Sequence, residues 1–255
     1  SEMCIRDRDK YGAKDERSWK LRFHTQTAGC SLTAQQPEIN IARTAFQALS
    51  GVLGGTQSLH TNSMDETLAL PSEKAAEIAL RTQQLIAYET GVANVVDPLG
   101  GSWFVEELTD QLEARAEEYF EEIGNIGGVI PAIEQGYFQR EIARSASNYQ
   151  QRVDTKKRIV VGVNKFVKED EQIEIPILKI DERAGESQRQ RLDVIKSSRD
   201  ESKVQNVLSA IQAACRNQEN LMPLIIKAAK EYATLGEIIA AMKSEFGEWQ
   251  ENSVF

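Results

Sequence analysis

A chain of 255 residues can form one large domain or two, and 41% hydrophobic residues suffice for a substantial core. A formal net charge of −9, without a basic stripe of interleaved aromatics, argues against a nucleic-acid partner. No run approaches the roughly 18 apolar residues of a membrane span, and no secretory signal is visible, so we expect no membrane partner. The three cysteines are widely spaced and odd in number, forming neither a disulfide framework nor a metal pattern. They favour a reducing, cytoplasmic location.

The amino end has features that are unusual for an intact gene product. The chain begins with Ser1, and residues 1–8 show neither a helical nor a strand period. We interpret residues 1–8 as an artefact or scar and leave them out of the fold prediction.

Two strand-length segments, residues 20–27 and 56–61, end in polar groups. The chain's two histidines, His24 and His60, fall one in each segment. Each segment is followed by a predicted helix. The two strands begin about 35 residues apart, a suitable length for a strand, a helix and their loops. The pattern predicts an α/β fold with neighbouring βα units and a ligand site at the carboxyl ends of their strands.

The first helix is predicted over residues 38–53, and the second opens at Ser72, which we expect to cap it. Gly54 ends the first helix and Gly91 the second. The apolar stripe of the first helix comprises Ile41, Ala45, Ala48, Leu49 and Val52. The buried face of the second comprises Ala75, Ile78, Ala79, Leu85 and Ile86.

A turn-rich break at residues 97–102 separates the two βα units from a mainly helical region. An acidic amphipathic helix is predicted over 105–123, and a short β-branched strand over 158–163. Further helices are predicted over 129–135, 137–152, 185–199, 202–216, 221–233 and 235–246.

The polar groups at the strand ends suit hydrogen bonding to a ligand better than nucleophilic catalysis. They are His24 and Gln26 on one segment, then Gln57, His60, Asn62 and the loop residue Glu66 on the other. A triad of Ser58, His60 and Asp65 is disfavoured, because residues two apart on a strand share a face without being placed for proton relay. The histidines lack a supporting metal-ligand pattern, so no metal site is predicted.

Structural interpretations of the same residues stay open at this point. A histidine in a barrel strand is often a satisfied interior group. Gln57 and Asn62 could cap neighbouring helices or satisfy loop backbone groups. Glu66 could be a charge near a helix start. Composition and periodicity alone indicate an α/β domain with a polar site and a helical extension.

Several long, unusual motifs resemble the methylmalonyl-CoA mutase family, in its large catalytic subunit of the split-subunit type. They are residues 22–29, 53–62, 65–66, 80–84, 97–102 and 161–165. The resemblance runs from about residue 9 to the end of the chain. It implies the last two βα units of a (β/α)₈ barrel over 9–92 and a helical extension over 93–255. The first six strands and the cobalamin-binding domain are absent from this chain, which we therefore expect to be inactive alone.

The resemblance also implies adenosylcobalamin chemistry. Family members use the cofactor's radical to take a hydrogen from an acyl-CoA, after which the thioester group migrates to the neighbouring carbon. The implied partners are an acyl-CoA substrate, a separate cobalamin-binding subunit and, as an open alternative, a second large subunit. Methylmalonyl-CoA and succinyl-CoA are the expected substrate pair.

Residue roles follow from the resemblance position by position. His24, Gln26 and Gln57 are expected to bind the substrate. The residues expected to contact the cofactor are Gly29, Asn62, Glu66 and Ala69. The alternatives are an isobutyryl-CoA or related mutase, and a non-catalytic module whose helical tail binds a partner.

Overall fold

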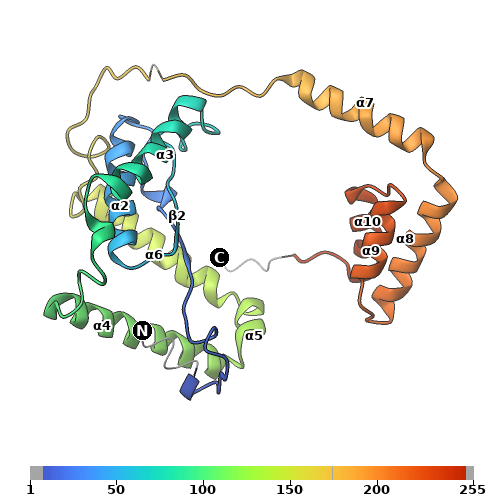
Figure 1. The fold of residues 1–255 in the computed structure, drawn as a ribbon, viewed down its shortest axis with the longest axis horizontal. Helices are drawn as coiled ribbons and strands as arrows, with labels where there is room; N and C mark the ends of the chain where they lie inside the picture. The colour runs from blue at the N-terminus through green and yellow to red at the C-terminus, as the bar shows by residue number, and fades with distance from the viewer. Residues whose placement is uncertain (1–7, 174, 251–255) are drawn as a thin grey trace. The chain divides into compact units, whose positions relative to one another are not determined.

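The computed structural model describes residues 8–173 and 175–250. The chain divides into two compact units, with the boundary between Leu178 and Lys179. Figure 1 labels the main elements of both units. This boundary differs from the one predicted at residue 92, between the barrel units and the helical extension. The boundary at residue 92 stays a prediction. Within the described ranges, no helix is both long enough and apolar enough to span a membrane. Residues 1–7, which we interpret as an artefact, lie outside the described ranges.

A small parallel sheet lies in the first unit. Its strands are β1 (His24–Gln26) and β2 (Ser58–His60), with His24 opposite Ser58 and Gln26 opposite His60. The two predicted strands are confirmed, but each is shorter than predicted because regular pairing covers only three residues. The sheet and the surrounding helices agree with an α/β fold.

Helix α2 (Ile39–Leu53) makes the crossover that a parallel strand pair requires. Its Gly51 faces the sheet, where a Cβ would lie 3.1 Å from Thr25 Cγ2 and 3.8 Å from Leu59 Cδ1. Only Ala48 of the predicted apolar stripe is fully buried. The buried row of α2 is Asn40, Thr44 and Ala48, spaced by one turn and largely polar.

Helix α3 (Glu73–Tyr88) begins as predicted. The Ser72 side chain accepts a hydrogen bond from the Ala75 amide and caps the helix. Ala75, Ala79 and Ile86 are buried as expected, but Leu85 is 49% exposed, so its predicted burial is wrong. Thr82 lies on the buried face in its place. Helices α2 and α3 lie side by side (Figure 1).

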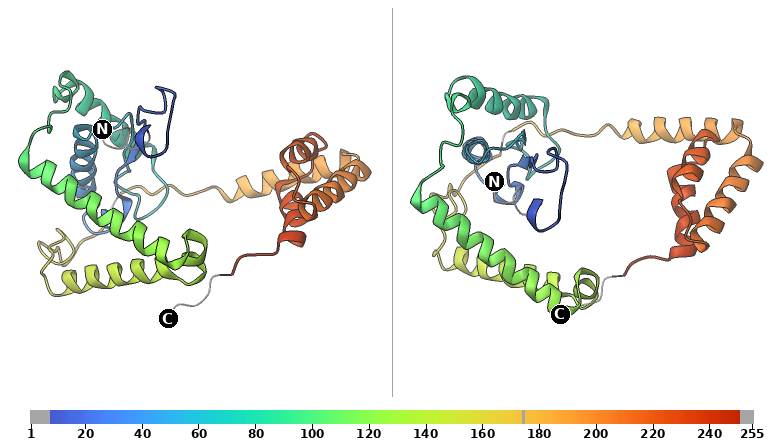
Figure 2. Two further views of the ribbon diagram at one scale, coloured as in Figure 1. Left: turned by 90° about the horizontal axis from the view of Figure 1, so that it is seen from below. Right: turned by 60° about the horizontal axis from the view of Figure 1, so that its bottom comes forward.

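The remaining elements of the first unit are helical. Two short 3₁₀ turns, η1 (Gly29–Ser31) and η2 (Val92–Asn94), follow β1 and α3. The helices are α4 (Trp103–Ile126), α5 (Val129–Glu134) and α6 (Tyr137–Asp154). In Figure 2, α5 lies where α4 and α6 approach each other. Side-chain hydrogen bonds from Tyr137 to Glu122 and from Tyr119 to Glu141 join α4 to α6 there.

The predicted strand over residues 158–163 is wrong. The segment forms a tight turn whose regular pairing is limited to one isolated bridge between Val161 and Lys165. Asn164 accounts for the difference: its side chain accepts from the Val160 amide and donates to the carbonyls of Val153 and Arg158. These bonds curl the backbone instead of leaving it free to pair with a strand.

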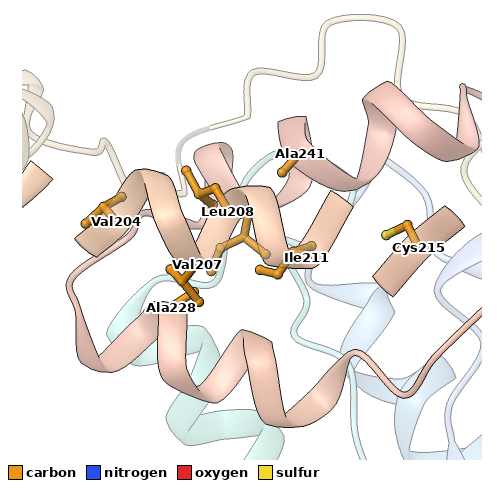
Figure 3. Close-up of a cluster of buried hydrophobic side chains, with 8 residues drawn as sticks. Val204, Val207, Leu208, Ile211, Cys215, Ala228 and Ala241 are labelled. Atoms are coloured by element: carbon orange, nitrogen blue, oxygen red, sulfur yellow. The ribbon is translucent and has the colours of Figure 1, made fainter. Parts of the chain in front are cut away.

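The second unit contains α7 (Glu182–Ser198), α8 (Glu201–Arg216), α9 (Met222–Lys230) and α10 (Leu235–Phe246). All four helices were predicted, with boundaries a few residues away. Figure 3 shows much of the apolar core of this unit. The core residues are Val204, Val207, Leu208, Ile211, Cys215, Ala228, Ile238 and Ala241.

Candidate functional site

The two faces of the small sheet have different chemistry. Thr25 and Leu59 point toward α2 and are partly buried. The opposite face is polar and exposed, and it carries His24, Gln26, Ser58 and His60. Because side chains alternate along a strand, the four polar groups share this face. The sheet therefore presents a polar surface that no element of the first unit covers among the described residues.

One hydrogen bond orders this face across the strands. His24 Nδ1 lies 2.7 Å from Ser58 Oγ, between residues that are register partners. The contact fixes the orientation of the imidazole ring. His24, predicted to line the substrate pocket, and Gln26 thus lie on one face, as residues two apart on a strand do.

The carboxyl ends of the strands are tied together by Thr27 and Asn62. The Thr27 amide donates to the His60 carbonyl at 3.1 Å, and the Asn62 amide donates to Thr27 Oγ1 at 2.9 Å. Gln26 Nε2 lies 3.5 Å from Asn62 Oδ1, at the outer limit of a hydrogen bond. Gln26 and Asn62, both expected at the carboxyl ends of the strands, lie side by side there, and their roles toward a ligand stay predictions.

Asn62 has an unused donor. The residue is only 2% exposed, and its Nδ2 is buried without a hydrogen-bond partner. A buried polar group without a partner costs free energy, commonly about 1–3 kcal/mol. Such an atom is a natural point of attachment for a ligand oxygen.

Gly29 lies against that donor and against Glu66. A Cβ on Gly29 would lie 2.2 Å from Glu66 Oε1 and 2.9 Å from Asn62 Nδ2. Only glycine permits this arrangement without movement of the carboxylate. We call Gly29, Asn62 and Glu66 the cradle: two loops bring a bare backbone, an amide donor and an exposed carboxylate together.

The loop that carries Glu66 and Ala69 is fixed by Asp65. Asp65 is fully buried, and its Oδ2 accepts from the Ser72 amide at 2.9 Å. Its carbonyl accepts from the amides of Leu68 and Ala69, at 2.8 and 3.1 Å. Ala69, predicted as a cofactor contact, is therefore held by its backbone in the same loop as Glu66.

Gln57 lies away from the carboxyl ends of the strands. Its Oε1 accepts from the Phe23 amide at 2.8 Å, and its Nε2 donates to the Gly55 carbonyl at 2.8 Å. These contacts place Gln57 at the amino ends of the strands. At about 3.3 Å of rise per residue, it is roughly 17 Å along the chain from Asn62. Its predicted grouping with the carboxyl-end residues is wrong, because Gln57 precedes the paired part of β2; its role toward substrate stays a prediction.

The triad alternative is also wrong. Ser58 contacts His24 and not His60, and the Asp65 carboxylate is engaged with the Ser72 amide. Among the described residues, no group of three or more His, Cys, Asp or Glu side chains is arranged to hold a metal ion.

Sequence reasoning missed two supporting residues, Thr27 and Asn40. Asn40 is fully buried in the first turn of α2 and makes side-chain hydrogen bonds to Thr33 and Met64. The available signal was Asn40 itself, a polar residue at the start of the helix beside the apolar stripe. A buried polar side chain on a helix face indicates hydrogen bonding to a neighbouring loop, whereas Thr44, one turn later, is buried with its Oγ1 unpartnered.

Comparisons with known proteins place the sequence of this chain in a family. The sequence profile of the family described as methylmalonyl-CoA mutase matches residues 5–248. Relatives include the 2-hydroxyisobutanoyl-CoA mutase large subunit of Aquincola tertiaricarbonis, 45% identical over 97% of this chain and 44% of its own length. The methylmalonyl-CoA mutase of Rhizobium meliloti is 45% identical over 91% of this chain and 33% of its own length. That of Escherichia coli is 42% identical over 94% of this chain and 34% of its own length.

The chain thus spans between a third and just under half of the relatives that it matches. The match extends over both compact units and across the cradle. The predicted resemblance is confirmed, and the chain belongs to the methylmalonyl-CoA mutase family.

Proposed function

We propose that this chain forms part of the large subunit of an adenosylcobalamin-dependent acyl-CoA mutase. In this proposal, β1–α2 and β2–α3 are the last two units of a (β/α)₈ barrel. The family membership supports the reaction class, an isomerisation that moves a thioester group between neighbouring carbons. The short parallel sheet supports the barrel, because its exposed polar face suits the interior of a closed sheet.

The observation that carries the proposal is the cradle. Asn62 offers a buried, unpartnered amide donor, and Glu66 offers a carboxylate that can accept from two neighbouring hydroxyl groups. A ribose presents such hydroxyl groups. Gly29 leaves its backbone bare where a flat macrocycle could approach. This donor set fits the adenosyl ribose and the corrin edge of adenosylcobalamin.

The cradle residues and Ala69 then each have a task toward the cofactor. Glu66 would accept from the ribose hydroxyls, and Asn62 Nδ2 would donate to a ribose oxygen. The loop fixed by Asp65 would present Ala69 to the corrin. When bound, adenosylcobalamin supplies the radical that removes a hydrogen atom from the acyl-CoA.

Substrate contacts are assigned to the polar sheet face. Gln26 holds the thioester carbonyl through its amide, which can donate a hydrogen bond without transferring a proton. His24, oriented by Ser58, lines the same wall. The closed barrel would keep water from the reacting carbons. The partners in this proposal are the acyl-CoA, a separate cobalamin-binding subunit and a second large subunit, in the cytoplasm.

Methylmalonyl-CoA, converted to succinyl-CoA, is the substrate that we propose first. A second candidate is a 2-hydroxyisobutanoyl-CoA type of substrate, since a relative of that name matches 97% of this chain. Assays of the complete subunit with methylmalonyl-CoA, 2-hydroxyisobutanoyl-CoA and isobutyryl-CoA distinguish them. If methylmalonyl-CoA is converted fastest, the first candidate is supported. If only another substrate is converted, the first candidate is rejected.

A chimera tests the cofactor site. This chain would replace the matching third of the Escherichia coli methylmalonyl-CoA mutase, which supplies the remaining parts. Glu66→Ala in the chimera should weaken adenosylcobalamin binding at least about tenfold, because a charge-assisted hydrogen-bond acceptor is lost. Glu89→Ala, at the exposed end of α3, is the matched control. Equal cofactor affinity for the unmodified chimera, Glu66→Ala and Glu89→Ala would reject Glu66 as a cofactor-binding residue. The 255 residues alone are expected to show no turnover.

A further inference from the structure

The turn formed by residues 160–166 contains the motif Val161–Lys165, to which the proposed function gives no task. The turn is built tightly: Asn164 makes three side-chain hydrogen bonds, and Gly162 adopts a φ of 84°. A Cβ on Gly162 would lie 3.2 Å from Gln36 Nε2. The turn is therefore shaped to meet the segment that precedes α2.

Two side chains bind this turn from the α2 side. Arg43 Nη2 donates to the Val161 carbonyl at 2.7 Å, and Gln36 Nε2 donates to the Phe166 carbonyl at 2.9 Å. Residues more than a hundred positions apart in the chain are joined here. The contacts fix where the Arg43 guanidinium lies.

The other nitrogen of Arg43 faces Asn40. Arg43 Nη1 donates to Asn40 Oδ1 at 2.7 Å and to Thr33 Oγ1 at 2.9 Å. These bonds orient the Asn40 amide, so that its Nδ2 can donate only toward the opposite side. Arg43 suits this task because its planar fork holds several acceptors in fixed directions.

Asn40 in turn joins the two loops that carry the cradle. Its Nδ2 donates to the carbonyls of Thr33 and Met64, at 2.8 and 3.0 Å, and its Oδ1 accepts from the Thr33 amide at 3.1 Å. Thr33 lies four residues after Gly29. Met64 lies between Asn62 and Glu66 in the sequence.

We propose that Arg43 and Asn40 are positioning residues, through which the turn at 160–166 sets the spacing between Gly29 and the Asn62–Glu66 segment. The importance of this spacing for cofactor binding rests on the proposed function. The spacing itself rests on the hydrogen bonds above. The bonds form one unbroken path: turn to Arg43, Arg43 to Asn40, and Asn40 to both loops.

Two variants test this path without altering the cradle. Arg43→Lys keeps the charge but cannot bind the Val161 carbonyl and Asn40 Oδ1 together. Asn164→Ala opens the turn without touching α2. Arg81→Lys, at an exposed arginine on α3 paired with Glu77, is the matched control for the first variant.

Amide hydrogen exchange on the complete chain is the first readout. Both variants should accelerate exchange at least about tenfold in residues 29–33 and 62–72, because loss of a charge-assisted hydrogen bond favours local opening. Exchange in the middle of α2 should stay unchanged. The control should match the unmodified chain. Exchange within twofold of the unmodified chain in both loops, or equal acceleration in α2 and the loops, would overturn the proposal.

Adenosylcobalamin affinity of the chimera is the second readout, and it separates this proposal from the proposed function. Both variants should raise the Kd at least about fivefold, and the Arg81→Lys control should leave it unchanged. Binding with an unaltered Kd in both variants would refute the positioning path and leave the proposed function standing. A chimera that binds no cofactor, with accelerated loop exchange in both variants, would refute the proposed function and leave the path standing.

Discussion

The two compact units bury different kinds of side chain. The core of the second unit is apolar and is formed by α8, α9 and α10. In the first unit, many of the described buried residues are polar, and they gather in the loops after the strands and on the adjoining helix faces. They are Thr27, Asn40, Thr44, Thr61, Asn62, Ser63, Asp65 and Thr82.

The difference reflects what each unit's interior does. Burial of apolar surface stabilises a fold by about 25 cal/mol per Å². It does little to fix the positions of individual loops. Buried hydrogen-bonded polar groups contribute less net stability, but they fix the positions of loops. The second unit therefore has an interior that contributes mainly apolar burial. The first unit has an interior that positions Gly29, Asn62 and Glu66.

The largest expected effect on stability is in the apolar core. Ile211 is fully buried, and Ile211→Ala should destabilise the second unit by about 3–4 kcal/mol through the cavity that it leaves. Urea unfolding followed by circular dichroism measures the change. Ile239→Ala, at a residue that is 49% exposed, should cost less than about 1 kcal/mol. Equal losses for both variants would contradict the core assignment.

A smaller effect is expected where the second unit does bury a charge. The Arg199 side chain is 4% exposed and binds Glu237 through both terminal nitrogens, at 2.6 and 2.8 Å. Glu237→Gln should cost about 2 kcal/mol at pH 7, because a charged hydrogen-bond acceptor is lost. Glu248→Gln, at a surface ion pair, should cost about 0.5 kcal/mol or less. Indistinguishable unfolding curves for these two variants would refute the prediction.

The same pair predicts a pH dependence. The hydrogen bonds from Arg199 lower the pKa of Glu237 from 4.5 to about 2. A depressed pKa in the folded state means that the stabilisation is complete above pH 4.5 and is lost as the pH falls toward 2. The unfolding free energy of the unmodified chain should therefore decline more steeply over this range than that of Glu237→Gln. Parallel pH profiles would contradict the assignment.

A still smaller effect on the free energy of unfolding is expected at the start of α3. Ser72→Ala removes the side chain that accepts from the Ala75 amide, and it should cost about 1 kcal/mol. Ser50→Ala, at an exposed position inside α2, should cost nothing measurable. Urea unfolding with a probe in the first unit compares them. Coincident urea transitions for Ser72→Ala and the unmodified chain would show that the Ser72 cap does not stabilise the first unit.

The cradle should show the smallest effect on stability. Gly29→Ala places a methyl group against Glu66 Oε1, on an exposed side chain, and 2.9 Å from Nδ2 of the buried Asn62. The free energy of unfolding should change by less than about 1 kcal/mol, since the exposed carboxylate can swing away and the Asn62 amide needs only a small shift. A loss above about 2 kcal/mol would mean that Gly29 is a packing residue and not part of a ligand site.

Local signals in the sequence predicted most helices and the Ser72 cap, because capping and periodicity act over a few residues. The exposed Leu85 shows their limit: the helical period does not say how wide the buried face is. The strand predicted at 158–163 failed for a different reason. β-branched residues favour a strand only where a partner exists, and here Asn164 bonds the local backbone instead.

The site was partly predictable. Gln26 ends β1, Asn62 and Glu66 follow β2, and all three were expected at one end of the sheet. Gln57 was misplaced because its position relative to the paired residues depends on where the register begins. The roles of Asn40 and Arg43 depend on a turn more than a hundred residues away, which local patterns cannot reveal.

Whether the cradle holds adenosylcobalamin is decided by the cofactor affinity of the chimera and of its Gly29→Ala variant. We expect a Kd at least about tenfold higher for the variant, with a thermal midpoint only a few degrees lower, because the methyl group occupies the space between Asn62 and Glu66. Equal affinity of the two proteins would contradict it.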